Sequence, residues 1–224
     1  DALDHLEELL QNDPSDPELN RLKVEALFRI KDYRRTNEFA SKLVGFDVKS
    51  ETFSDEKTIG GDQPEIFYML AQSLMRARGK KETSLLVIDR MIEMNPDSHL
   101  AHLNLSTFLS SLGEKERAAA SLDRAYELDP TDVTILTQKG RMAAGNENFE
   151  EAANIFRDAI ELHPDNLDLY RSLARVEMAR KNYDVALAIV EEGLLEFRDQ
   201  HGVYLKLEKV EIQLIIGDFA GIEQ

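Results

Sequence analysis

Apolar residues along residues 65–200 recur at intervals of three and four, which is the spacing of one face of an α-helix. The same order of apolar, small and polar positions returns every 34 residues, four times in succession. Each unit holds two helical stretches joined by a short polar turn, such as Gly113-Glu-Lys-Glu. A lone helix pair cannot bury its apolar faces, so this period predicts a stack of helix pairs.

Proline ends the second helix of three successive units, at Pro96, Pro130 and Pro164. Proline supplies no backbone N–H, and its ring clashes with the preceding helical turn. The residues that follow have short polar side chains of the kind that cap a helix N-terminus. We therefore predict N-caps within Asp97-Ser98, Thr131-Asp132 and Asp165-Asn166.

Small residues return at fixed places in both helices of a unit. Ala118, Ala152 and Ala186 open the second helix, and Gly140 and Ala174 lie within the first. Small side chains let two helix backbones approach closely where they cross. A larger residue at such a place would overpack the contact by roughly 1 to 3 kcal/mol.

At these residues the chain resembles the tetratricopeptide repeat (TPR) family. The resemblance implies an all-α fold, namely a right-handed superhelical solenoid of antiparallel helix pairs. It rests on the small residues, on Ala125 and Ala159 later in the second helix, and on the terminal prolines. The sequence departs from the family pattern at His102 and Leu136, where an aromatic residue is expected, and at Arg198, which replaces the proline.

We expect a single TPR array over residues 1–224. Its parts are the second helix of a partial repeat (1–16), a divergent repeat (17–48), an inserted loop (49–64), four full repeats (65–98, 99–132, 133–166 and 167–200) and a partial repeat (201–224). Both ends fall inside a repeat, which suggests a fragment of a longer array. The insertion is polar and predicts a surface loop, more readily mobile than ligand-binding, with Phe53 and Ile59 as its anchors.

Charge and composition narrow the range of partners. The net charge of −16 opposes non-specific binding to nucleic acid or to anionic lipid. The sequence has no apolar run long enough for a membrane span. It also has no cysteine, which excludes disulfides and thiolate metal sites but leaves the compartment open, cytoplasmic or periplasmic.

Catalytic signatures are absent from the sequence. It contains no phosphate-binding loop, no nucleophile elbow and no His-Glu-x-x-His motif. His99 and His102 stand three apart on one predicted helix, but no third ligand accompanies them. We therefore predict a protein that is not an enzyme and holds no metal or cofactor.

The resemblance implies a binding site, because the first helix of each unit lines a concave groove in this family. Carrying over the groove positions gives Met69, Asn104, Gln138, Arg141, Arg171, Arg175, Lys206 and Lys209. Five of these residues are cations, and Asp168 is the acid among the groove positions around them. A basic stripe would suit an acidic or carboxylate-ended peptide, since Arg binds carboxylates in bidentate fashion. Alternatively, these cations pair with acids of the neighbouring unit, and such exposed pairs contribute only about 0 to 1 kcal/mol.

The main functional hypothesis is a non-enzymatic interaction scaffold that binds a peptide or protein segment in its groove. A second hypothesis is a repeat segment of a larger multidomain protein, such as an enzyme or an envelope or polysaccharide-export assembly component, whose activity lies elsewhere. A third is self-association through exposed end repeats, where Leu214, Ile215 and Ile216 would leave apolar surface uncovered.

Overall fold

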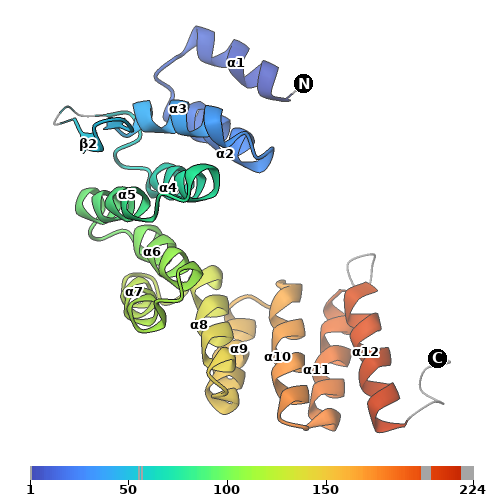
Figure 1. Ribbon diagram of the computed structural model, residues 1–224. Coiled ribbons are helices and arrows are strands. Elements are labelled where there is room, and N and C mark those ends of the chain that lie inside the picture. The colour runs from blue at the N-terminus through green and yellow to red at the C-terminus, as the bar shows by residue number, and fades with distance from the viewer. Residues whose placement is uncertain (1, 55, 57, 198–202, 218–224) are drawn as a thin grey trace. The chain divides into compact units, whose positions relative to one another are not determined.

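The computed structural model describes residues 2–54, 56, 58–197 and 203–217. Within them the chain forms twelve helices and one small two-stranded sheet, which confirms the predicted all-α helical-repeat fold (Figure 1). Two compact units divide the chain, Asp1–Leu128 and Asp129–Gln224. Each unit has its own core and is described by itself below.

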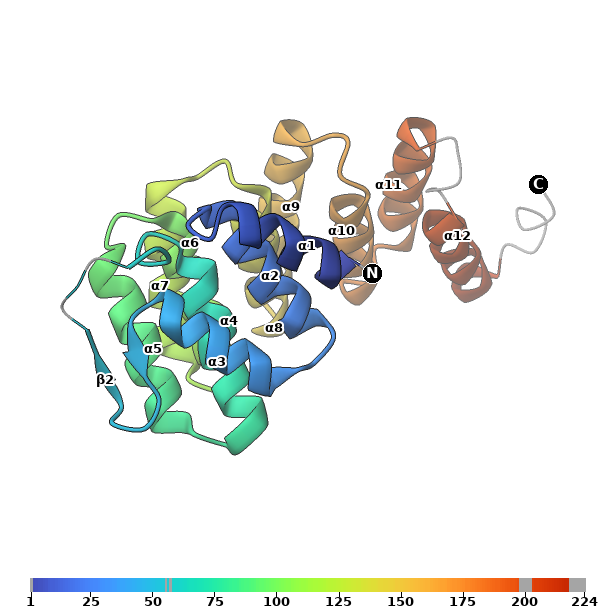
Figure 2. The same cartoon turned by 90° about the horizontal axis from the view of Figure 1, so that it is seen from above.

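The first unit consists of stacked antiparallel helices with a short hairpin inserted among them (Figures 1 and 2). Its elements are α1 (Ala2–Asn12), α2 (Pro17–Arg29), α3 (Tyr33–Leu43), β1 (Phe46–Asp47), β2 (Thr52–Phe53), α4 (Pro64–Arg78), α5 (Lys81–Met94), α6 (His99–Ser111) and α7 (Lys115–Leu128). Ile66, Leu70 and Leu74 of α4 are fully buried at the centre of its core. This row, spaced by four, forms the buried face of α4.

The second unit stacks five helices in sequence order (Figure 1). They are α8 (Val133–Gly145), α9 (Phe149–Leu162), α10 (Leu167–Ala179), α11 (Tyr183–Glu196) and α12 (Val203–Ile216). Phe156 of α9, Tyr170 of α10 and Leu205 of α12 are buried in one shared core cluster. The candidate binding residues of this unit therefore lie on helices held by a common core.

Local sequence sets where these helices begin. Ser98 accepts a hydrogen bond from the Ala101 N–H, and Asp132 accepts bonds from the N–H groups of Thr134 and Ile135. Asn166 caps α10 in the same way through the N–H of Asp168. The three N-caps predicted after the prolines are thus confirmed.

Within each of the four regular repeats, one residue in the turn between the two helices adopts the left-handed conformation, at positions spaced by the repeat. Gly79 and Gly113 do so with φ of +62° and +78°. Glu147 and Lys181 occupy the corresponding places with φ of +63° and +64°. A side chain in this region crowds its own backbone, whereas glycine does not. The regular repeats of the second unit therefore carry backbone strain where those of the first have glycine, and Lys31 in the turn between α2 and α3 of the first unit is strained in the same way, with φ of +63°.

Close helix crossings explain the small residues. A Cβ placed on Gly140 would lie 2.6 Å from Cζ of Phe156. A Cβ on Gly193 would lie 2.8 Å from Cδ1 of Leu205 and 3.1 Å from Cγ of Tyr170. Glycine at these two positions lets aromatic rings of the core rest directly against a helix backbone.

The inserted segment departs from the expected plain loop. Phe46 of β1 pairs with Phe53 of β2 in antiparallel register, and the centroids of their rings are 4.7 Å apart. At the hairpin turn, the carboxylate of Glu51 accepts hydrogen bonds from Lys80 Nζ at 2.7 Å and Thr83 Oγ1 at 2.8 Å. Phe53 is an anchor as predicted, but Ile59 is 40% exposed and is not. The hairpin is therefore tied at one end to the core and at its tip to α5.

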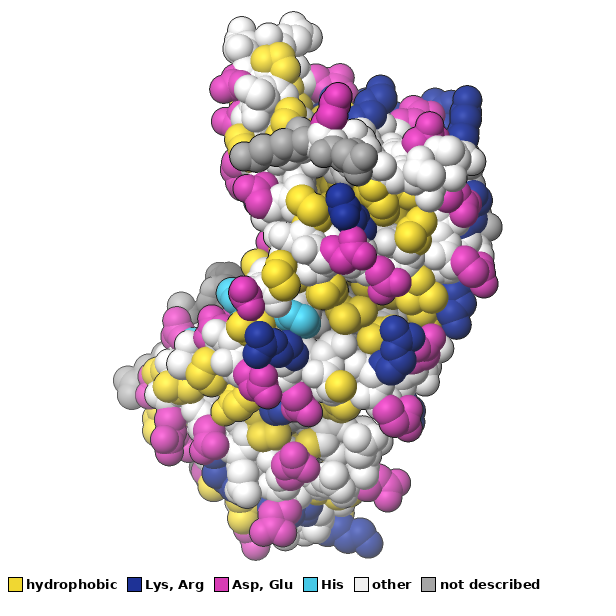
Figure 3. All heavy atoms as spheres, turned by 90° about the vertical axis from the view of Figure 1, so that its left-hand side faces the viewer, with side chains coloured by type: hydrophobic (Ala, Val, Ile, Leu, Met, Phe, Trp, Pro, Cys, Tyr) yellow, Lys and Arg dark blue, Asp and Glu magenta, His cyan; other side chains and the backbone are white. Residues whose placement is uncertain are grey.

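Charges of both signs are mixed on the surface. On the face shown in Figure 3, Asp and Glu side chains lie interspersed with Lys, Arg and apolar side chains. None of the helices in the described part of the chain is long and apolar enough to cross a membrane.

Candidate functional site

The predicted binding residues fall into both units. Met69 on α4 and Asn104 on α6 belong to the first unit. The second unit holds the other six, namely Gln138 and Arg141 on α8, Arg171 and Arg175 on α10, and Lys206 and Lys209 on α12. Only the six in the second unit can be treated as one candidate surface.

Two of the predicted arginines converge on one acid. Glu208 of α12 has an oxygen, Oε1, 2.8 Å from Arg175 Nη2 and 3.4 Å from Arg171 Nε. Arg171 also contacts Asp168 at 3.2 Å, and its guanidinium lies 5.0 Å from the ring centroid of Tyr204. Much of the charge of Arg171 is therefore balanced within the unit.

Glu208 itself is 4% exposed, an unusual position for a carboxylate. Burial raises the pKa of its carboxyl, and the neighbouring Arg175 and Arg171 only partly oppose this effect. Neither carboxylate oxygen accepts a well-formed hydrogen bond in the described part of the chain. The two arginines thus compensate the buried charge through ionic contacts alone.

Sequence reasoning missed Glu208 because it lies outside the groove positions. One signal was available, since Glu208 stands 34 residues after Ala174 and 68 after Gly140, at the small position of the first helix. An acid at a place that is otherwise small and buried indicates a charge partner nearby.

The remaining cations differ in their partners. Lys209 Nζ contacts Glu191 of α11 at 3.0 Å. Lys206 is exposed, as is Arg141, and neither makes an ion pair with another described residue. Gln138 is partly buried. Arg171, Arg175 and Lys209 therefore pair with acids, as the alternative interpretation expects. Arg141 and Lys206 do not, so their charges are available to a ligand.

Arg141 and Arg175 border the same cavity. It has a volume of about 340 Å³ and lies among α8, α9 and α10. Phe149, Phe156 and Val176 give it apolar walls, and Ser172 adds a hydroxyl. The side chain of Arg175 is 63% exposed. An apolar cavity with guanidinium groups beside it can take an apolar side chain together with a neighbouring carboxylate.

The two predicted binding residues of the first unit, Met69 and Asn104, are both at least partly buried. Met69 is 7% exposed and belongs to the core cluster, so it offers little surface to a ligand. Asn104 is partly buried on α6.

Family models describe two stretches of this chain. Both are models of the tetratricopeptide repeat; they match residues 68–133 and 143–209 and together span more than half of the sequence. The stretches contain the whole of α6 and α10 and the first half of α12, but most of α8 falls in the gap between them. They therefore include the predicted binding positions except Gln138 and Arg141.

Solved structures share the fold at low sequence identity. PilF of Pseudomonas aeruginosa is 21% identical with a TM-score of 0.60, and the alignment covers 74% of this chain and 74% of PilF. Yeast Tom70 is 16% identical with a TM-score of 0.75; the alignment covers 95% of this chain but only 43% of Tom70. YrrB, a TPR protein with an unusual peptide-binding site, is 16% identical with a TM-score of 0.56, over 92% of this chain and 97% of YrrB. No curated protein sequence matches the chain.

Proposed function

Because the chain belongs to the tetratricopeptide repeat family, we propose that it is a non-enzymatic protein-interaction scaffold whose second unit binds an acidic peptide segment. The proposed site is the surface of α8, α10 and α12 that carries Arg141, Arg175 and Lys206. Proteins built from these repeats generally act as scaffolds. A structural relative, YrrB, has a peptide-binding site.

The observation that carries this proposal is the cavity between Arg141 and Arg175. Its apolar walls match a hydrophobic side chain, and the two guanidinium groups that border it match carboxylates next to that side chain. A cavity of about 340 Å³ is at the small end of ligand sites in proteins, which suits one anchoring side chain. We infer a ligand with an apolar residue flanked by Asp or Glu.

The contact with Glu208 does not use all the hydrogen-bond donors of Arg175. A guanidinium has five N–H donors in a planar fork, and Arg175 directs Nη2 to Glu208. Its other donors remain for a ligand. Arg171 has less to offer, because Asp168, Glu208 and the Tyr204 ring already surround it. We therefore assign the leading roles to Arg141, Arg175 and Lys206 rather than to all five predicted cations.

The test compares two charge-matched variants in pull-downs from lysate, quantified by mass spectrometry. The site variant is Arg141→Glu with Lys206→Glu, which reverses two exposed cations without ion-pair partners among the described residues. The control is Lys31→Glu with Lys115→Glu, which makes the same change in net charge on exposed residues of the first unit. Circular dichroism checks that both variants keep the helix content of the wild type.

Partners that bind wild type and control but are lost with the site variant would support the proposal. Their shared sequence should then contain an apolar residue beside Asp or Glu. If both variants retain the same partners, the surface of α8, α10 and α12 is not the binding site.

A further inference from the structure

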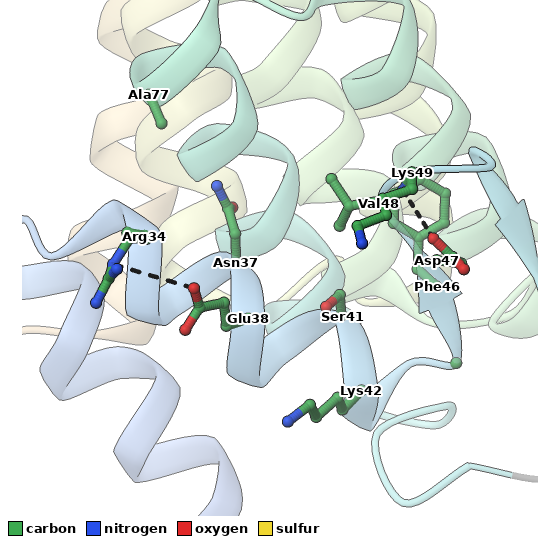
Figure 4. A pocket seen from close by; sticks show the side chains of 11 residues that line it. Arg34, Asn37, Glu38, Ser41, Lys42, Phe46, Asp47, Val48, Lys49 and Ala77 are labelled. Atoms are coloured by element: carbon green, nitrogen blue, oxygen red, sulfur yellow. Dashed lines mark hydrogen bonds and ion pairs between the residues drawn. The ribbon is translucent and has the colours of Figure 1, made fainter.

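The first unit contains a second, larger pocket at the inserted hairpin. It has a volume of about 870 Å³, which lies within the usual range of ligand sites. Figure 4 shows it between α3, the hairpin segment and Ala77 near the end of α4. The hairpin contributes Phe46, Val48 and Lys49 to the wall. One wall of the pocket is thus formed by the first strand of the hairpin and the turn that follows it.

A buried amide faces this pocket. Asn37 of α3 is 7% exposed, and its Oδ1 has no hydrogen-bond partner among the described residues. Such an unsatisfied buried group destabilises the fold relative to a bonded one. Ser41 lies one helical turn further along α3 and lines the same pocket. A buried amide that the fold leaves without a partner is suited to a partner from outside.

The charges around the pocket favour an anionic ligand. Arg34, Lys42 and Lys49 line it together with Glu38 and Asp47, so cations exceed acids in a chain of net charge −16. Arg34 Nε lies 4.0 Å from Glu38 Oε1, which is a long distance for an ion pair. Asp47 is occupied by its own turn, since its carboxylate accepts the N–H groups of Lys49 at 2.7 Å and Ser50 at 3.2 Å. Lys42 and Lys49 are exposed and make no ion pair with another described residue.

From this arrangement we propose that the pocket at the hairpin binds an acidic peptide segment, with Asn37 pairing with its backbone and Lys42 and Lys49 holding its carboxylates. An asparagine side chain carries an N–H donor and a carbonyl acceptor, as a peptide bond does. It can therefore both donate a hydrogen bond to a peptide group and accept one from it. Figure 4 shows Asn37 rising from α3 and Lys49 extending from the hairpin, on opposite sides of the space that the peptide would occupy.

This site is separate from the one proposed in the second unit. It is built from α3, the second helix of its repeat, and from β1 with the turn that follows it, whereas the other site uses α8, α10 and α12. The two proposals can therefore fail independently.

The experiment selects ligands on a chain whose other site is disabled. A phage library of random heptapeptides is panned on the Arg141→Glu, Lys206→Glu chain, and enriched sequences are synthesised for calorimetric titration. They are titrated into the same chain carrying Asn37→Leu, or Lys42→Glu with Lys49→Glu, or the control pair Lys31→Glu with Lys115→Glu. Glutarate and inorganic phosphate are tested as competitors.

We expect acidic heptapeptides whose affinity falls at least about tenfold with Asn37→Leu and with the double lysine reversal, but not with the control pair. Because Oδ1 of Asn37 has no partner, Asn37→Leu should leave the melting temperature equal to or above that of the parent chain. The lysine reversal alters only exposed side chains and tests the same site without touching the interior.

Three results would overturn the proposal. They are enrichment of sequences without Asp or Glu, affinities that neither variant changes, and displacement of the peptides by phosphate or glutarate at equal concentration. The last result would identify a site for a small anion instead of a peptide. The proposal would equally be overturned by a lowered melting temperature for Asn37→Leu together with unchanged affinity for the lysine variant, because Asn37 would then have a purely structural role.

Discussion

Replacing Gly140 by alanine tests the close helix crossing in the second unit. The added Cβ would stand 2.6 Å from Cζ of Phe156 and 2.8 Å from both of its Cε atoms. Phe156 is 1% exposed, so its ring has little room to withdraw. Overpacking of this kind costs about 1 to 3 kcal/mol, whereas alanine in place of glycine inside a helix gains up to about 1 kcal/mol. We expect Gly140→Ala to lower the free energy of unfolding by up to about 2 kcal/mol.

Gly145 provides a control on the same helix. Nothing lies within 4 Å of a Cβ built there, so Gly145→Ala should gain helix propensity without a clash. The difference between the two variants therefore isolates the overpacking, expected at about 1 to 3 kcal/mol. Urea denaturation followed by circular dichroism measures it, provided that the slope with denaturant is unchanged.

A double variant sharpens this test. Phe156→Leu removes the ring atoms nearest the new Cβ, so Gly140→Ala should cost less in that background than in the wild type. The reasoning would be refuted if Gly140→Ala were as stable as Gly145→Ala, or if Phe156→Leu left its cost unchanged.

Two further changes probe strain and charge in the second unit. Glu147→Gly should raise the free energy of unfolding by about 0.5 to 1 kcal/mol, because φ is +63° there, while Glu150→Gly inside α9 should lower it by a similar amount in the same denaturation assay. Burial raises the pKa of Glu208 above 4.5 in the folded chain. Its carboxyl therefore contributes to the free energy of unfolding below pH 4.5, and this contribution is lost as pH rises through the folded-state pKa. The stability of Glu208→Gln relative to wild type should therefore increase from about pH 4 to about pH 7, and a flat difference would contradict the raised pKa.

The regular part of the fold could be predicted because each of its determinants is local. Proline stops, polar caps and the spacing of apolar residues act within one or two helical turns, and Ser98, Asp132 and Asn166 cap their helices as expected. The hairpin depends on partners distant in sequence. Its strands have two residues each, too few to show alternation, and the contact of Glu51 with Lys80 and Thr83 spans about thirty residues.

The candidate sites show the same division. The helix that carries each of the eight predicted residues followed from the repeat, but the pairing of Arg171 and Arg175 with Glu208 did not, because that acid lies outside the groove positions. Asn37 is polar and gave no sign in the sequence that its amide would be buried without a partner. Ligand binding by the predicted groove residues stays a prediction.

The order of helix contacts has a kinetic consequence. The principal contacts join helices that are neighbours or next neighbours along the chain, as in α8 with α9, α9 with α10 and α4 with α6. Few distant segments must meet before stabilising contacts form, and the entropy lost in closing large loops is small. We expect each unit to fold within microseconds to milliseconds, typical of helical proteins of low contact order. Synthesis adds only about 5 to 20 residues per second, so helix pairs can assemble while the rest of the chain is still being made.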